Sequence, residues 1–164
     1  MSETTASRPR VDTRGPRFGA AITAVLLLVN LSLALLAPPS GANLVERLSH
    51  GSVLLALVIF ALFLYGALRG VQHHPYGLFF ARVVRPRLSS PGETEDAAAP
   101  TFAQAVGAVV TGVGLLLTLL GLPLALPIAL AAAFVAAFLN AAFGLCLGCE
   151  LYLLFRRAGV IRSA

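Results

Sequence analysis

The chain has 164 residues, of which 58% are hydrophobic and only 12% are charged, and its mean hydropathy is +0.88. This composition excludes an ordinary soluble domain and predicts a membrane protein. Its 12 basic and 7 acidic residues give a net charge of +5. All 12 basic residues are Arg, and most of them flank apolar stretches, so we expect them to contact lipid headgroups. We therefore exclude nucleic acid as a partner.

The first apolar run begins after an Arg-rich N-terminal segment. Residues 1–17 are polar, and we predict a disordered cytoplasmic tail there. Residues 19–37 are uncharged and close to the roughly 20 residues that cross a bilayer. The alternative is a cleaved signal peptide, with Ser40 and Ala42 at the small-residue positions of its cleavage site. The run exceeds the roughly 7–15 residues of a signal h-region, so we interpret it as an uncleaved span.

The second predicted span covers about residues 49–68 and ends at Arg69. Its helix begins either near Asn43, a residue type that favours helix N-termini, or near Val53. The sequence leaves both starts open.

The connection of residues 69–101 has two parts of different character. Residues 76–85 combine Leu, Phe and Val with two Arg, a pattern typical of a short segment that lies on the membrane surface. Residues 89–100 place three acidic residues among Pro, Gly and Ala, which predicts a flexible acidic loop.

The last two spans are joined by a tight hairpin. The third covers residues 102–120, with Thr101 and Gln104 expected to form a capping box at its start. The Gly-Leu-Pro sequence at 121–123 predicts the turn. The fourth span is predicted to run without interruption over residues 127–154.

The distribution of Arg predicts the orientation. Four Arg lie in the N-terminal tail, four in the long connection and three after the fourth span, against one on the other side. The positive-inside rule then places both termini, including the tail of residues 158–164, in the cytoplasm, with the chain in the inner (plasma) membrane. The predicted fold class is all-α: a single polytopic membrane domain of residues 18–157, forming a four-transmembrane-helix bundle.

Cys146 and Cys149, followed by Glu150, form the motif with the most chemical potential. In a continuous fourth helix the three residues share one face, and Glu150 lies roughly 9 Å inside Arg156. A carboxylate at that depth is a functional candidate by default. Four basic residues are candidate partners for it: Arg69, His73, His74 and Arg82.

Thiol chemistry is the first interpretation of the cysteine pair, and a continuous helix opposes it in two ways. Near the C-terminal end of a helix, the dipole and the apolar surroundings disfavour a thiolate. Residues three apart also hold their Cβ atoms about 5–6 Å apart, whereas a disulfide needs roughly 3.8 Å. Gly144 and Gly148 are the positions at which the helix could unwind.

Two other interpretations of the pair remain open. The thiolates could bind a metal ion together with His73 and His74, or a dimer could supply four Cys. Alternatively the pair only packs helices, because Cys is small and Gly144 and Gly148 have the GxxxG spacing of membrane helix contacts. A transporter is the weakest option, since the spans offer few polar groups to coordinate a solute.

Four stretches carry a resemblance to a known family: VDTRGPRFGAAITAV (11–25), HPYGLFFARVVRPRL (74–88), PTFAQAVG (100–107) and NAAFGLCLGCELYLLFRR (140–157). Through them the chain resembles, over most of its length, the bacterial integral membrane family catalogued as domain of unknown function 4395. The family has no established activity, so the resemblance implies the membrane topology and no cofactor or reaction. Thioredoxin-like and sulfurtransferase proteins are often encoded near such proteins, which implies partners of those kinds.

The resulting hypothesis is a membrane protein whose cytoplasm-facing Cys-x-x-Cys pair exchanges electrons or sulfur with such a soluble partner, while Glu150 assists proton transfer. The alternatives are a non-catalytic scaffold or interaction protein and a metal-binding membrane protein. Whether the chain forms a homo-oligomer, and whether it is an enzyme at all, stays open at this stage.

Overall fold

The computed structural model describes residues 9–88 and 92–160. In chain order its elements are β1 (Arg10–Asp12), α1 (Arg14–Leu36), α2 (Leu44–Leu48), α3 (Gly51–Arg69), η1 (Val71–His73), α4 (Pro75–Phe79), η2 (Phe80–Val84), η3 (Arg85–Arg87), β2 (Thr94–Asp96), α5 (Ala98–Leu119), α6 (Ala125–Phe143) and α7 (Leu147–Arg157).

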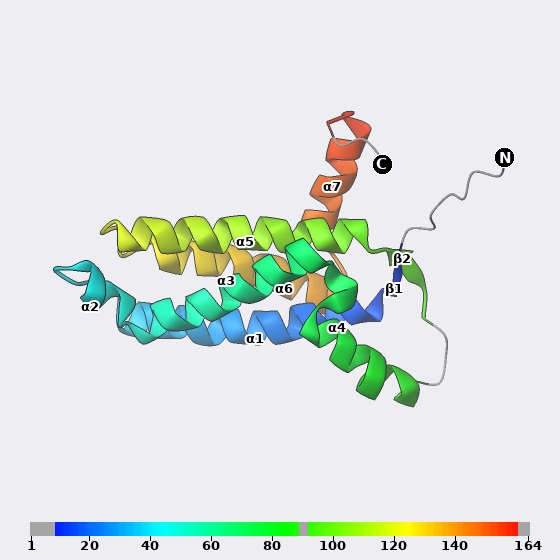
Figure 1. Ribbon diagram of the computed structural model, residues 1–164, viewed down its shortest axis with the longest axis horizontal. Coiled ribbons are helices and arrows are strands. Elements are labelled where there is room, and N and C mark those ends of the chain that lie inside the picture. The colour runs from blue at the N-terminus through cyan, green and yellow to red at the C-terminus, as the bar shows by residue number, and fades with distance from the viewer. Residues whose placement is uncertain (1–8, 89–91, 161–164) are drawn as a thin grey trace.

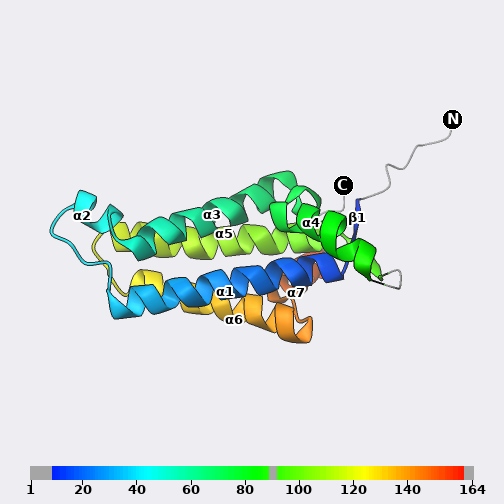
Figure 2. The same ribbon diagram turned by 90° about the horizontal axis from the view of Figure 1, so that it is seen from below.

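Four helices, α1, α3, α5 and α6, are long and apolar enough to cross a membrane. They lie side by side along one axis, with α1 packed against α6, α3 against α5 and α5 against α6 (Figures 1 and 2). This arrangement confirms the predicted all-α four-helix class.

The bundle is apolar both inside and outside. Leu27, Leu126 and Leu130 are fully buried at its centre, while many equally apolar side chains, such as Val25 and Leu116, are exposed on its outer surface. A helix that is hydrophobic on every side is expected where lipid replaces water around the protein.

The two ends of the bundle differ in charge. One end carries α2 and the hairpin between α5 and α6; the other carries the β1–β2 pair, α4 and α7 (Figure 1). Among the described residues, Arg47 is the only Arg at the first end, where its guanidinium donates hydrogen bonds to the carbonyl oxygens of Gly41 (3.0 Å) and Leu119 (2.9 Å). It thereby satisfies a carbonyl left unpaired at the end of α5.

The predicted disordered tail and acidic loop are partly ordered, which corrects both predictions. Strands β1 and β2 pair antiparallel, with Arg10 opposite Asp96, and α1 already begins at Arg14. Each segment provides hydrogen-bond partners for the backbone N–H and C=O groups of the other. Neither segment has such partners on its own. Residues 1–8 and 89–91 of these predictions lie outside the described part of the chain.

The start of the second span combines the two options left open. Asn43 does cap a helix, because its side chain accepts a hydrogen bond from the Glu46 N–H at 2.9 Å. That helix is the separate five-residue α2, and the membrane helix α3 begins at Gly51.

The third span begins earlier than predicted, at Ala98. The carboxylate of Asp96 accepts a hydrogen bond from the Ala98 N–H (2.9 Å) at the first turn, and Pro100 is tolerated there because first-turn N–H groups have no helical partner. Thr101 is therefore not the N-cap, and its hydroxyl instead accepts a hydrogen bond from the Val71 N–H at 3.3 Å.

Residues 76–85 are helical and leave the bundle at an angle (Figure 1). The segment is attached to α1 through aromatic contacts: the ring of Phe18 lies 6.0 Å from that of Phe79 and 5.7 Å from that of Phe80. Phe80 is buried, so this segment is a fixed part of one end of the bundle.

Candidate thiol site

The cysteine pair lies at a break between two helices. Helix α6 ends at Phe143, Gly144 adopts a left-handed conformation (φ +72°), and α7 begins at Leu147. The break corrects the predicted continuous span of residues 127–154. Its physical reason is Gly144, since the left-handed region costs glycine little and terminates helices.

Helix α7 turns out of the bundle and crosses the end of α5 (Figure 1). Gly148 allows this contact, because a Cβ atom at that position would lie 2.5 Å from the Cβ and 2.6 Å from the Cα of Ala103. On the same side the ring of Phe102 contacts the rings of Tyr152 and Phe155. Gly148 therefore lies in close contact with Ala103 of α5, while Gly144 lies in the turn between α6 and α7.

Cys146 is the N-cap residue of α7 and Cys149 lies in its first turn. The two form a disulfide with their Cα atoms 5.2 Å apart, and the Cys149 N–H donates to Cys146 Sγ at 3.3 Å. The expectation that the cysteines approach a helix C-terminus is therefore wrong. A helix N-terminus offers unpaired N–H groups and a positive dipole end, both of which stabilise a thiolate.

Glu150 does not lie where a continuous helix would place it. It is exposed, in the first turn of α7, and the described residues record no ion pair for it with the predicted partners. The depth of roughly 9 Å below Arg156 assumed a helix perpendicular to the membrane, whereas α7 runs across the bundle end. Glu150 is thus adjacent to the cysteines in sequence and open to solvent.

His73 and His74 are each committed to local structure. The buried His74 ring donates from Nε2 to the Leu62 carbonyl (3.2 Å) and accepts the Tyr76 N–H at Nδ1 (3.3 Å), and burial lowers the pKa of His74. The exposed His73 contacts the Arg69 carbonyl through Nδ1 (2.8 Å). No three His, Cys, Asp or Glu residues in the described part of the chain are grouped closely enough to hold a metal ion.

Arg17 is a residue near the site that the sequence did not single out. Its Nη2 donates to the Ala141 carbonyl at 3.4 Å, and its guanidinium carbon lies 3.6 Å from where a Cβ of Gly144 would be. It thus places a fixed positive charge beside the turn that leads to Cys146. Arg17 and Ala141 are 124 positions apart in the chain, so no local sequence pattern could predict this contact.

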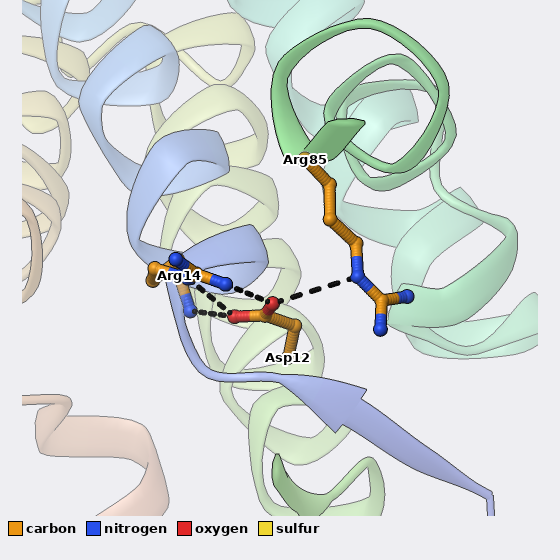
Figure 3. Close-up of polar contacts among 3 residues, drawn as sticks. All are labelled: Asp12, Arg14 and Arg85. Carbon is orange, nitrogen blue, oxygen red and sulfur yellow. Dashed lines mark hydrogen bonds and ion pairs between the residues drawn. The ribbon is translucent and has the colours of Figure 1, made fainter. Parts of the chain in front are cut away.

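A second polar cluster, at the N-terminus of α1, is centred on Asp12 (Figure 3). Its carboxylate is 6% exposed, accepts the backbone N–H of Arg14 and two hydrogen bonds from the Arg14 guanidinium (3.0 and 2.8 Å), and lies 3.8 Å from the guanidinium of Arg85. The side-chain hydrogen bonds from Arg14 are the main cause that lowers the pKa of Asp12. Asp12 thereby joins β1, α1 and η3 at this end of the bundle.

The lowered pKa predicts that Asp12 stabilises the fold at neutral pH and loses this effect in acid. The contribution is present above the pKa of an unfolded Asp, about 4, and disappears as the pH falls through the lowered folded value. Asp12→Asn should therefore lower the thermal unfolding temperature in detergent by a few degrees at pH 7, and its difference from the wild type should be smaller at pH 3. Glu93→Gln, at an exposed carboxylate, is the control. A constant difference at both pH values would contradict the ion-pair account.

Between the four membrane helices and α7 lies a cavity of about 440 Å³ at the same end of the bundle. Cys146 forms part of its wall, together with Gly148 and Leu151 of α7. The disulfide therefore adjoins this partly open cavity through Cys146.

These features define a class: a polytopic membrane protein of four spanning helices with a helix-capping Cys-x-x-Cys disulfide at one end of the bundle. The chain belongs to the DUF4395 family (domain of unknown function), whose model matches residues 11–157. No curated protein and no solved structure matches the chain. The family membership confirms the resemblance noted from the sequence and leaves the function to be argued from the site.

Proposed function

We propose that this protein is a membrane thiol–disulfide exchange protein and that Cys146 and Cys149 are its reactive pair. The observation that carries the proposal is the position of Cys146 as the N-cap of α7 with its disulfide partner three residues later. In this position the Cys149 N–H already donates to Cys146 Sγ, so a thiolate released there has a hydrogen-bond donor in place.

The course of the exchange reaction depends on which of the two sulfurs, Cys146 Sγ or Cys149 Sγ, is the better leaving group. A thiolate of a soluble dithiol partner attacks Cys149 Sγ, the disulfide breaks, and Cys146 leaves as a thiolate held at the end of α7. The second thiol of the partner then attacks the partner's first sulfur in the mixed disulfide. The partner's own disulfide forms, and Cys149 leaves as a thiolate. The partner ends oxidised by two electrons, and the pair ends as two reduced cysteines.

Two features support a soluble partner on the cytoplasmic side. The end of the bundle that carries the pair also carries every described Arg except Arg47, and the positive-inside rule assigns such an end to the cytoplasm. Glu150, exposed beside Cys149, is our candidate for moving protons between the thiols and water. Thioredoxin-like and sulfurtransferase proteins, which carry reactive thiols, are the partners we propose.

Trapping of the mixed disulfide tests the proposal. In Cys146→Ser the Cys149 thiolate should displace thionitrobenzoate from a thioredoxin-like protein that lacks its own resolving cysteine and carries this leaving group on its remaining cysteine. The mixed disulfide should then accumulate as a covalent complex, because no neighbouring thiol is left to resolve it. The complex is measured on non-reducing gels and confirmed by mass spectrometry of the joined peptides. Cys149→Ser, which retains only the cavity-lining Cys146, should form much less of it.

The double variant Cys146→Ser/Cys149→Ser is the blank, and its four-helix bundle should be intact because the hydrophobic core contains neither cysteine. If the two single variants yield no more complex than this blank, the pair has no exchange function. The pair then serves only to fix the junction of α6 and α7, as in a non-catalytic scaffold.

A further inference from the structure

The cavity beside Cys146 has the size and position of a small-molecule site. Its volume of about 440 Å³ lies within the roughly 300–1,000 Å³ of such sites, and its wall is built from β1, α1, α3, α5, α6 and α7 together with the η1–η3 segment. Because four of these helices are long and apolar enough to span a bilayer, a ligand that reaches the cavity from lipid is itself apolar.

The wall is mainly apolar and built largely from small residues. Gly15 and Gly19 of α1, Gly107 of α5, and Ala132 and Ala136 of α6 all line it. The small residues let aromatic side chains of the wall approach closely: Phe80 lies against Gly15, Tyr76 against Gly19 and Phe63 against Gly107. A wall that contains aromatic rings offers stacking contacts to a flat ring.

Polar side chains interrupt this apolar wall: the charged residues Arg10, Asp12 and Arg85 line it at the Arg-rich end of the bundle, and three amide side chains line it as well. Gln72, Gln104 and Asn140 line the cavity, and Gln72 Oε1 is buried without a hydrogen-bond partner. A buried carbonyl oxygen without a partner costs free energy, so it marks a place where a donor from a ligand is missing. An amide both donates and accepts, and thus it can bind a ring carbonyl and, after reduction, the corresponding hydroxyl.

We propose that this cavity binds the ring of a lipid-soluble p-quinone, which accepts two electrons from reduced Cys146 and Cys149. The inference rests on the proposed thiol exchange and names the oxidant that regenerates the disulfide. An acyl chain would also fit an apolar cavity. It cannot form hydrogen bonds with the three amides, however, and it does not react with the sulfur atom of Cys146 in the wall.

The reaction balances in electrons and protons. The Cys146 thiolate attacks the quinone ring and forms a carbon–sulfur bond. The Cys149 thiolate then attacks Cys146 Sγ, so the carbon–sulfur bond breaks, the disulfide forms and the electron pair stays on the ring. With two protons, originally those of the two thiols, the ring leaves as the hydroquinone. Two thiols and one quinone thus become one disulfide and one hydroquinone.

The test uses the full chain, reduced with dithiothreitol, freed of the reductant and placed in detergent with decyl-ubiquinone as the probe. The loss of quinone absorbance should correspond to one quinone reduced per disulfide formed. The rate of this reaction should reach a plateau as the quinone concentration rises. Ala136→Phe fills the cavity and should slow this step about tenfold or more. Val135→Phe places the same ring on the exposed face of α6, where Val135 is 51% exposed, and should leave the rate unchanged.

Gln72→Leu is the second cavity variant, and it should raise the quinone concentration at half saturation even if Ala136→Phe folds poorly. A rate that rises linearly with quinone, or equal rates for the wild type and both cavity variants, overturns the inference. Exchange of the wild-type pair with oxidised glutathione, measured without quinone, reports the proposed function separately. If that exchange proceeds while the cavity variants have no effect, the quinone site fails and the thiol exchange stands; if it does not proceed, the proposed function fails as well.

Discussion

Substituting Val for Gly144 should make the Cys146–Cys149 disulfide markedly easier to reduce. Gly144 holds φ at +72°, a region in which a β-branched residue is strained by about 1–3 kcal/mol. The strain favours continuing α6 as a regular helix, in which the two Cβ atoms move to about 5–6 Å apart. For a two-electron couple this cost corresponds to a reduction potential less negative by about 20–60 mV. Equilibration of the detergent-solubilised chain in dithiothreitol buffers, followed by thiol alkylation and mass spectrometry, measures the shift.

The matched control is Gly159→Val. Gly159 also has a positive φ (+71°), but nothing lies within 4 Å of where its Cβ would be, and it follows α7 instead of preceding it. The backbone strain is therefore similar while the cysteine-bearing turn is untouched. Equal potentials for the Gly144 and Gly159 variants would contradict the view that the turn at Gly144 creates the reactive site.

Gly148→Leu should displace α7 from the bundle. Even a Cβ at this position would lie 2.6 Å from the Cα of Ala103, a distance that real side chains do not adopt, so α7 must move. Overpacking of this kind costs about 1–3 kcal/mol and also opens the contact of Phe102 with Tyr152. We expect a lower unfolding temperature, faster alkylation of the reduced cysteines, and weaker formation of the mixed disulfide in the Cys146→Ser background.

The control for this variant is Gly51→Leu, at a helix residue with nothing within 4 Å of its Cβ position. A milder form of the same test is Gly148→Ala, whose defect should be partly relieved by Ala103→Gly because the second change removes the nearest Cβ atom. If the pair of changes is no better than Gly148→Ala alone, the close approach of α5 and α7 does not position the cysteines.

Much of the candidate site could be named from the sequence, but its geometry could not. The spacing of Cys146 and Cys149 is visible directly, and their position near the Arg-rich end follows from the charge pattern. Their place at a helix N-terminus was missed because Gly144 alone marks the break within a long uncharged stretch, and a glycine in a membrane helix also serves close helix packing. The direction that α7 takes after Gly144 brings it against α5, whose contacting residues lie more than 40 positions earlier in the chain.

The tail and the acidic loop show the same limit. Neither segment has a hydrophobic pattern, so each alone was predicted to be unstructured. Both are held by partners distant in sequence: β1 pairs with β2, and Asp12 approaches Arg85. An isolated strand of three residues is not stable, and only the closing of the bundle brings its partner to it.

By itself, the sequence determined that the chain is a four-helix membrane protein with one Arg-rich end, because length and hydropathy of each span, and the charge beside it, are local properties that a bilayer selects directly. Only the tertiary structure decided that the cysteines cap α7, that Glu150 faces solvent and that Cys146 borders a cavity. Those features depend on where helices cross and which small residues let them approach. Contacts between residues far apart in the chain fix them, and no local pattern encodes such contacts.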